Sequence, residues 1–163
     1  MSLEFLGYAR SGGGAGTRNA VAVVASVICS TFPVEEIARR VPGTVPVVHP
    51  FGCAQVGDDS TQTQRTLAGV AANPNVGAAL IVGLGCETNQ ASVLAERIGA
   101  AKPIEILGIQ EAGGSDVVVR VGSEIAARFV RDRERETRVR CGAEALTVGI
   151  LGVDADERTY ESV

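Results

Sequence analysis

Short apolar runs alternate with longer amphipathic segments along most of the chain. Residues 20–27 form a nearly continuous, β-branched run, which predicts a strand buried on both faces. By the same criteria we expect further strands at 44–48, 77–82, 104–109 and 147–151, and helices at 33–41, 60–72, 90–100 and about 116–138. This alternation predicts an α/β fold: a three-layer, doubly wound (flavodoxin- or Rossmann-like), mainly parallel sheet of four to five strands.

Length and composition agree with one such domain. The chain has 163 residues, and we expect a single α/β domain over residues 1–152 followed by a polar C-terminal tail at 153–163. Apolar residues make up 45% of the chain, which excludes a disordered protein, whereas aromatic residues make up only 4%. The core must therefore consist of Val, Ile, Leu and Ala. The Gly-rich residues 7–19 are expected to form a loop.

Charge and hydropathy exclude several classes of partner. The net charge is −4 and the isoelectric point is about 5.1, which argues against nucleic-acid binding. Arginines at 128–140 are interspersed with acidic residues, as on a solvated helix face. No apolar stretch reaches the roughly 18 residues of a membrane span, and residues 1–9 lack the pattern of a signal peptide. We therefore expect a cytoplasmic protein with no membrane partner.

Three of the four cysteines follow predicted strands. Cys29, Cys53 and Cys86 come after the first, second and third strands, and Gln110 follows the fourth. The carboxyl ends of parallel strands meet at one edge of the sheet, where ligands bind in open α/β folds. Two interpretations stay open: the thiolates bind a soft metal such as iron or an iron–sulfur cluster, or they are ordinary buried thiols. Cys141 follows the Arg-rich helix, away from this edge, and is expected to be structural.

Other polar residues near the same edge suggest acid–base and anion-binding chemistry. His49, the sole histidine, ends the second strand, and Glu87 adjoins Cys86; either can act as a metal ligand, an acid or a base, although a structural role for His49 is equally plausible. The segment Gly113-Gly114-Ser115 begins a helix and can bind a carboxylate through backbone N–H groups, or form a simple capped turn. The loop at 12–16 precedes the first strand rather than following one, so no nucleotide cofactor is expected.

Several segments in fixed order resemble one known family. They include Gly16-Thr17-Arg18-Asn19, His49-Pro50-Phe51-Gly52-Cys53-Ala54-Gln55-Val56-Gly57-Asp58-Asp59, Asn73-Pro74-Asn75-Val76-Gly77, Val82-Gly83-Leu84-Gly85-Cys86-Glu87, and Gln110-Glu111 with Gly113-Gly114. Together they resemble the altronate and galactarate dehydratases, a family that includes the large subunit of sulfolactate sulfo-lyase. The resemblance covers about residues 5–130, and corresponds to the middle α/β domain of that family.

The resemblance implies a lyase that removes water, or sulfite, from a sugar acid or another hydroxy acid. It implies a divalent metal, iron in the first instance, and partners in the form of a small N-terminal-type subunit and a C-terminal-type domain; a homo-oligomer is also compatible. The expected metal ligands are Cys29, Cys53 and Cys86, and the expected catalytic residues are His49 and Glu87. The expected substrate-binding residues are Arg18, Asn19, Gln110, Gly113, Gly114 and Ser115.

The chain also departs from the family pattern. Gly12-Gly13-Gly14 stands where the family usually has Asp-Gly-Arg, and Asp116-Val117 stands where a lysine is usual. These departures support an alternative function: a catalytically inactive binding or assembly module that keeps the fold and an anion pocket.

Overall fold

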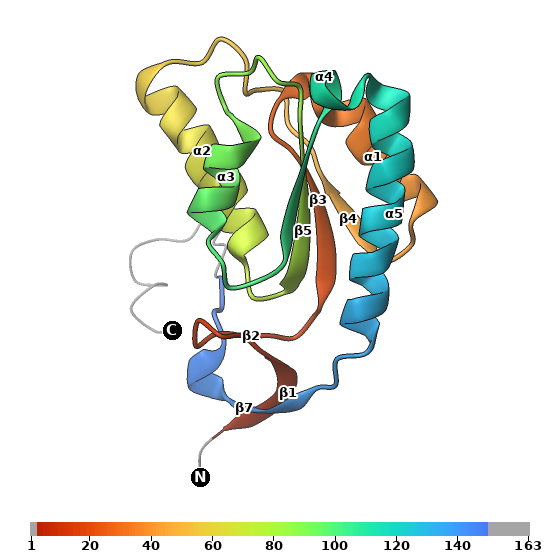
Figure 1. The fold of residues 1–163 in the computed structure, drawn as a ribbon. Coiled ribbons are helices and arrows are strands. Elements are labelled where there is room, and N and C mark those ends of the chain that lie inside the picture. Colours follow the sequence, from red (N-terminus) through yellow and green to blue (C-terminus); the bar gives the residue numbers. More distant parts are fainter. Residues whose placement is uncertain (1–2, 150–163) are drawn as a thin grey trace, which may run out of the picture.

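A four-stranded parallel sheet forms the centre of the molecule. The computed structural model describes residues 3–149, and Figure 1 shows the sheet with helices packed on both faces. The strand order is β4 (Thr44–Val47), β3 (Ala20–Ala25), β5 (Val76–Gly83) and β6 (Ile104–Gly108). The expected three-layer α/β fold with a parallel sheet is therefore confirmed.

Two pairs of helices cover the sheet. On one face lie α1 (Thr31–Arg40) and α5 (Ser115–Glu134), and on the other lie α2 (Gly57–Ala72) and α3 (Ala91–Ile98). The short helices η1 (Ile28–Ser30) and α4 (Ile109–Ala112) follow β3 and β6. Within residues 3–149, no helix combines the length and the hydropathy needed to cross a membrane.

The two central strands are apolar throughout because both of their faces are covered. In β3, Ala22 and Val24 pack towards α2 and α3, whereas Val23 and Ala25 pack towards α1 and α5. β5 follows the same alternation and is buried along almost its whole length. Side chains alternate between the two faces of a strand, so a strand between two helix layers needs an apolar residue at every position.

Several predicted boundaries differ from the structure. α2 begins at Gly57 rather than residue 60, so that Asp58 and Asp59 lie in its first turn, where carboxylates favour the helix dipole. α5 ends at Glu134 rather than near 138, because the chain turns there into another strand. The described part of the expected strand at 147–151, residues 147–149, is irregular, and the rest of it lies outside the described residues.

A second, antiparallel sheet was not predicted. β1 (Glu4–Ala9) pairs with β2 (Ala15–Gly16) on one side and with β7 (Val139–Gly142) on the other, and η2 (Ala143–Ala145) follows. The expectation of an uninterrupted loop at 7–19 was therefore wrong. Pairing between residues more than 130 positions apart leaves no local signal in a Gly-rich segment. Cys141 lies in β7 opposite Phe5 and is buried, as expected of a structural thiol.

Lys102, the sole lysine of the chain, ties α2 to the central sheet. Its ammonium group donates hydrogen bonds to the carbonyls of Ala71 (2.7 Å), Asn73 (2.9 Å) and Val76 (2.8 Å). Two of these carbonyls lie at the carboxyl end of α2, where a cation is favourable. Burial, together with the nearby Arg10, lowers the pKa of Lys102 to about 8.

Candidate functional site

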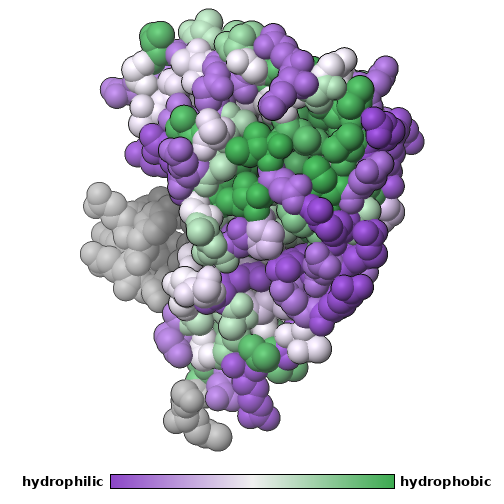
Figure 2. All heavy atoms as spheres, in the orientation of Figure 1, coloured by the Kyte–Doolittle hydropathy of each residue, from purple (hydrophilic) through white to green (hydrophobic). Residues whose placement is uncertain are grey.

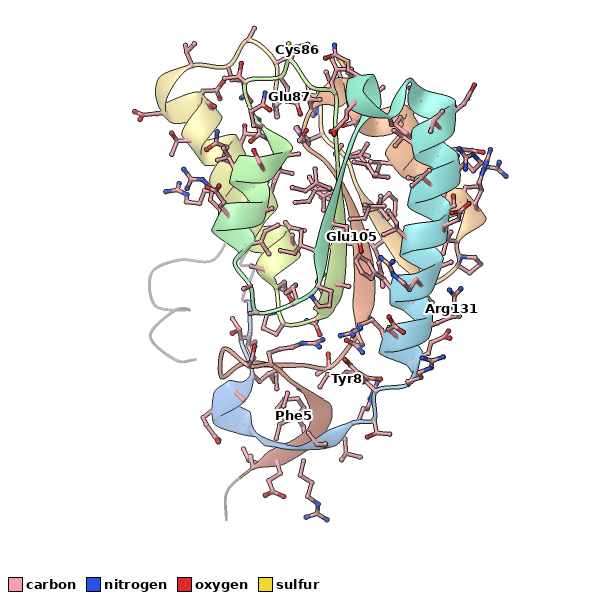
Figure 3. All side chains as sticks on the ribbon, in the orientation of Figure 1. Phe5, Tyr8, Cys86, Glu87, Glu105 and Arg131 are labelled. Carbon is pink, nitrogen blue, oxygen red and sulfur yellow. The ribbon has the colours of Figure 1, made fainter. Side chains whose placement is uncertain are left out.

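The loops that follow the four parallel strands open at the same edge of the sheet. Figure 3 places Cys86 and Glu87 at this carboxyl edge, near the top of the molecule. Cys29 lies in η1, Cys53 in the loop after β4 and Cys86 in the loop after β5, and all three thiols are exposed. The interpretation of these cysteines as ordinary buried thiols is therefore excluded.

Cys86 and Gln110 are brought together at this edge. The Gln110 side-chain amide donates a hydrogen bond to Cys86 Sγ across 3.8 Å, and the Gln110 backbone N–H donates to the Leu84 carbonyl (3.0 Å). These contacts join the loop after β5 to the start of α4. Both side chains are exposed, so the thiol and the amide are accessible to a small molecule.

Glu87 is buried and holds the loop after β5 in place. Its carboxylate accepts hydrogen bonds from the Ser26 hydroxyl (2.9 Å) and from the backbone N–H groups of Leu84 (3.2 Å) and Gly85 (2.5 Å). Only 4% of the residue is exposed. The structure therefore gives Glu87 a positioning role beneath Cys86, and the catalytic role remains a prediction.

Asn89 connects three loops of the carboxyl edge, and sequence reasoning missed it. Its side-chain amide donates to the Ser26 carbonyl (2.7 Å), and its backbone N–H donates to the Gly52 carbonyl (3.2 Å). The side chain is almost fully buried. The sequence offered one signal for Asn89: it is a polar residue three positions after Cys86, in the loop that follows a buried strand. The pattern of apolar positions does not identify such a residue.

Replacing Glu87 with glutamine is expected to destabilise the fold by about 1–3 kcal/mol. The new amide nitrogen has no lone pair, so at least one buried donor among those of Ser26, Leu84 and Gly85 loses its acceptor. Urea unfolding followed by circular dichroism measures the change. Glu111→Gln, at an exposed carboxylate of the same edge, is the matched control and should change stability by less than about 0.5 kcal/mol. Equal stability of E87Q and the wild type would contradict the positioning role.

His49 is engaged by the backbone at both ring nitrogens. Nε2 lies 3.0 Å from the Ala25 carbonyl, and Nδ1 accepts the N–H of Phe51 across 3.1 Å. A carbonyl only accepts, so this pattern requires the tautomer with hydrogen on Nε2. His49 also lines a hollow of about 280 Å³ with Phe51, Asp59 and Thr63. In this arrangement both ring nitrogens are engaged by the backbone, which favours the structural interpretation.

The loop after β4 is shaped by Gln55, another residue that sequence reasoning did not single out. Its carbonyl oxygen accepts the Gly52 N–H (3.0 Å), and its amide donates to Asp59 (2.8 Å) and Thr63 (3.0 Å) of α2. Gln55 is 7% exposed, so these bonds form in a desolvated setting. They fix the backbone on either side of Cys53 against the start of α2.

The Gly113-Gly114-Ser115 segment opens α5 without a side-chain cap. Gly113 and Gly114 have φ of +92° and +132°, and Gly114 rather than Ser115 occupies the N-cap position. Among residues 3–149, no side chain caps the first N–H groups of this 20-residue helix. The segment lies at the same edge as Cys86 and Gln110 because it follows α4 directly.

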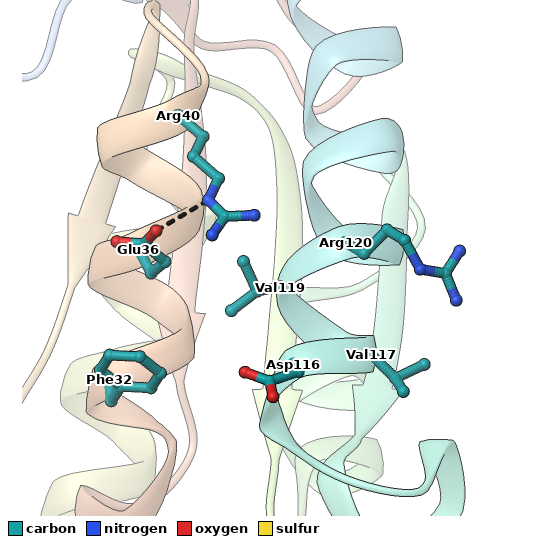
Figure 4. Close-up of a pocket in the computed structure, with 7 residues that line it drawn as sticks. All are labelled: Phe32, Glu36, Arg40, Asp116, Val117, Val119 and Arg120. Atoms are coloured by element: carbon teal, nitrogen blue, oxygen red, sulfur yellow. Dashed lines mark hydrogen bonds and ion pairs between the residues drawn. The ribbon is translucent and has the colours of Figure 1, made fainter.

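A groove of about 420 Å³ lies between α1 and α5, and Figure 4 shows its lining. It contains none of the predicted site residues. Glu36 on its wall accepts hydrogen bonds from Arg39 (2.7 and 2.8 Å) and Arg40 (2.7 Å). The bonds from Arg39, and next those from Arg40, lower the pKa of Glu36 to about 2. The charge of Glu36 is therefore satisfied within α1, whereas Asp116 and Arg120 of the same lining belong to α5.

Acidification should remove the contribution of Glu36 to stability. Its pKa is about 2 in the folded chain and ordinarily 4.5, so the contribution is complete above pH 4.5 and is lost as the pH falls from 4.5 towards 2. The difference in melting temperature between the wild type and Glu36→Gln should be small, because the arginines are exposed, and should shrink over that range. A difference that stays constant on acidification would contradict the role of these ion pairs.

Arg18 and Asn19 do not join the other predicted site residues. They precede β3 and lie at the amino edge of the sheet, opposite the edge that holds Cys86. The Asn19 carbonyl oxygen accepts from Arg10 (2.8 Å), and its amide donates to the Arg133 carbonyl (3.1 Å) and to Glu136 (2.8 Å). The structure therefore does not bring Arg18 and Asn19 together with Gln110 and Gly113, and their assignment to substrate binding stays a prediction. Asn19 instead joins the small sheet and the end of α5 to the parallel sheet.

The described residues do not assemble a metal-binding group by themselves. Within residues 3–149, no three or more side chains of His, Cys, Asp or Glu are grouped so that they could hold a metal ion. The thiols of Cys29, Cys53 and Cys86 share an edge, but they do not fit a resident metal as they stand. Their assignment as ligands stays a prediction.

Comparison with known proteins identifies related sequences. The model of the family described as "D-galactarate dehydratase/Altronate hydrolase, second domain" matches residues 7–134. The chain is 33% identical over 153 residues to the (2R)-sulfolactate sulfo-lyase subunit beta of Chromohalobacter salexigens. It is 33% identical over 106 residues to the altronate dehydratase of Escherichia coli and 32% identical over 104 residues to that of Bacillus subtilis.

These relatives are much longer than the chain. The matches take in 93% of the chain but 39% of the sulfo-lyase subunit, and 59% and 58% of the chain but 21% of each altronate dehydratase. No solved structure matches the chain significantly. The family match ends with α5, so β7 and η2 lie beyond it.

Proposed function

We propose that the chain forms part of a lyase, because it belongs to the D-galactarate dehydratase and altronate hydrolase family. It corresponds to the second domain of that family. The reaction is removal of water, or of sulfite, from a hydroxy-acid substrate, with sugar acids as the first candidates. The observation that carries the proposal is the accessible Cys86–Gln110 pair beside the uncapped start of α5, within the part of the chain that matches the family.

The chemistry of such an elimination suits what this edge offers. A proton next to a carboxylate is weakly acidic, so the substrate carboxylate must be held and its developing charge stabilised. The N–H groups at the start of α5 can bind that carboxylate, and the Gln110 amide can donate to a hydroxyl or carboxylate oxygen. Glu87 and Asn89 would keep the loop of Cys86 at a fixed distance from them. Asp116, in the first turn of α5, disfavours a second negative charge and so restricts where the anion lies.

A base and a complete metal site are proposed to come from outside the described residues. Iron or another divalent metal would polarise the leaving group, and Cys53 and Cys86 would supply thiolate ligands to it jointly with a partner domain or subunit. The small share of each relative that the chain covers supports such a partner. Metal analysis of anaerobically purified protein, alone and with the partner polypeptide, tests this. We expect the metal to be retained only in the complex and to be lost when Cys86 is replaced (Cys86→Ser). A complex that contains no metal would refute the proposed metal site.

Ligand binding by the chain itself tests the site without requiring turnover. Galactarate, altronate and sulfolactate are added in turn, and amide hydrogen exchange is followed by NMR. Protection is expected in residues 84–90 and 110–118, and Gln110→Ala should weaken it. Arg18→Ala, at the opposite edge, is the control and should leave binding unchanged. Protection at the amino edge, or no binding of any of the three, would refute the assignment of the site.

An inactive binding or assembly module is the second candidate. It is favoured by the ring nitrogens of His49, both of which bind the backbone, and by the lack of a metal-holding group within residues 3–149. Turnover assays of the complex separate the two. Release of a keto acid or of sulfite that is abolished by C86S supports the lyase. Ligand binding with no turnover in the complex supports the module.

A further inference from the structure

A hollow of about 280 Å³ lies between the loop after β4 and the first three turns of α2. Its lining contains neither Cys86 nor Gln110. The volume is close to the lower end of the range of about 300–1,000 Å³ that is typical of small-molecule pockets, so the hollow suits a small ligand. The lining consists of His49 and Phe51 of the loop and Asp59, Gln62, Thr63, Thr66 and Leu67 of α2.

Hydrogen-bond donors around this hollow are largely used within the protein. Gln55 donates its side-chain amide to Asp59 (2.8 Å) and to the hydroxyl of Thr63 (3.0 Å). The Thr66 hydroxyl donates to the backbone carbonyl of Gln62 across 2.8 Å. The oxygens of Asp59 and Thr66 can therefore act towards a ligand only as acceptors. The lining thus favours a ligand that brings several hydrogens of its own.

The charge of the lining is negative. Asp59 carries it, and among the residues that the structure describes the lining includes no lysine and no arginine. One Asp59 oxygen accepts the amide of Gln55, which is neutral and leaves the negative charge in place. An anion would be repelled here, whereas a cation would gain a charge-assisted hydrogen bond.

The remaining walls are aromatic and aliphatic. The rings of His49 and Phe51 stack with their centroids 6.2 Å apart, Phe51 is half exposed, and Leu67 is buried. Such walls hold an apolar body, and the face of an aromatic ring also attracts cations. The hollow thereby differs from the front of the molecule, where Figure 2 shows hydrophobic residues gathered between α3 and α5 of Figure 1.

We propose that this hollow binds a small organic cation, with a primary ammonium group beside Asp59 and an apolar body against Phe51 and Leu67. An ammonium group carries three hydrogens and accepts none, which matches the acceptors of Asp59, Thr66 and Gln62. The hydroxy acids proposed for the Cys86–Gln110 edge are anions. The two sites therefore differ both in their residues and in the charge of their ligands.

Three ligands with the same four-carbon body test the proposal. n-Butylammonium, n-butanol and butyrate are titrated in turn into the purified chain, and the NMR chemical shifts of residues 49–67 are followed. Butylammonium should bind at least about tenfold more tightly than butanol, and butyrate should not bind. Equal affinities of butylammonium and butanol, binding of butyrate among these residues, or no binding of butylammonium there would overturn the proposal.

Two adjacent carboxylates provide a matched pair of variants. Asp59→Asn removes the charge, but its side-chain oxygen can still accept the amide of Gln55, and it should weaken butylammonium binding at least about tenfold. Asp58→Asn lies in the same first turn of α2 but outside the lining, and should weaken binding by less than about twofold. Equal effects of D59N and D58N would show that only the general negative potential of the helix start attracts the cation, and would overturn the proposal.

The aromatic wall is tested separately. Phe51→Leu keeps an apolar side chain and removes the ring, so it should weaken the binding of butylammonium about two- to fivefold and leave that of butanol unchanged. An equal loss for both ligands would contradict the attraction between the ring and the cation. None of these variants alters Cys86 or Gln110, so failure of this proposal would leave the proposed lyase site untouched.

Discussion

Replacing Gly52 with alanine should destabilise the protein by about 3–5 kcal/mol and lower its melting temperature by at least about 6 °C. Gly52 has a φ of +96°, a backbone conformation that residues with a side chain rarely adopt. A Cβ atom there would collide with the Ser26 carbonyl oxygen and lie 2.8 Å from Val27 Cα. Both neighbours are backbone atoms at the end of β3, so neither can move aside cheaply. Differential scanning calorimetry measures the effect.

Gly57→Ala is the matched control for this substitution. Gly57 also has a positive φ, of +58°, but a Cβ atom there meets nothing within 4 Å. It should cost only the backbone strain, about 1–2 kcal/mol. The difference between the two variants isolates the close approach of the Cys53 loop to β3. Equal losses in both would show that this approach is not a constraint.

Asn19→Ala should be the second most damaging of these changes, at about 2–4 kcal/mol. It removes the acceptor for Arg10, whose side chain is only 11% exposed, and it removes the donor to the Arg133 carbonyl and to Glu136. The joint between the small sheet, the end of α5 and the parallel sheet then loses its central residue. Guanidinium chloride unfolding measures the loss.

Arg18→Ala is the comparison for Asn19→Ala, because Arg18 adjoins Asn19 in the sequence but its side chain is not part of the joint. The Arg18 backbone N–H binds Asn75 Oδ1 (2.9 Å), and this bond survives removal of the side chain. Stability should change by less than about 0.5 kcal/mol. A loss for Asn19→Ala no larger than that for Arg18→Ala would contradict the role of Asn19 in the joint.

The parallel sheet was predictable because burial on both faces leaves a local pattern. β3 and β5 are short, continuous apolar runs, and each is followed by a helix with one apolar face. β1 and β7 carry no such pattern. They pair with each other although almost the whole sequence separates them, and both are partly exposed. Their existence depends on tertiary contacts that local periodicity does not record.

The candidate site was predictable only as far as topology determines it. The rule for parallel sheets brought Cys86, Gln110 and Gly114 to one edge, and the structure agrees. Resemblance to a family placed Arg18 and Asn19 with them, although a recurring motif can equally be part of the scaffold. Whether the three thiols can share one ion depends on loop geometry to within an ångström or two, which residue spacing does not give.

The hydrogen bonding of Lys102 has a practical consequence for handling the protein. As the sole lysine, it is the only side-chain primary amine in the chain, and three carbonyl groups already occupy its ammonium hydrogens. Reagents that biotinylate or cross-link amines would have to break the attachment of α2 to β5 in order to react there. Labels and surface tethers are better directed to the exposed Cys29, which lies in η1 rather than in the loop of Cys86.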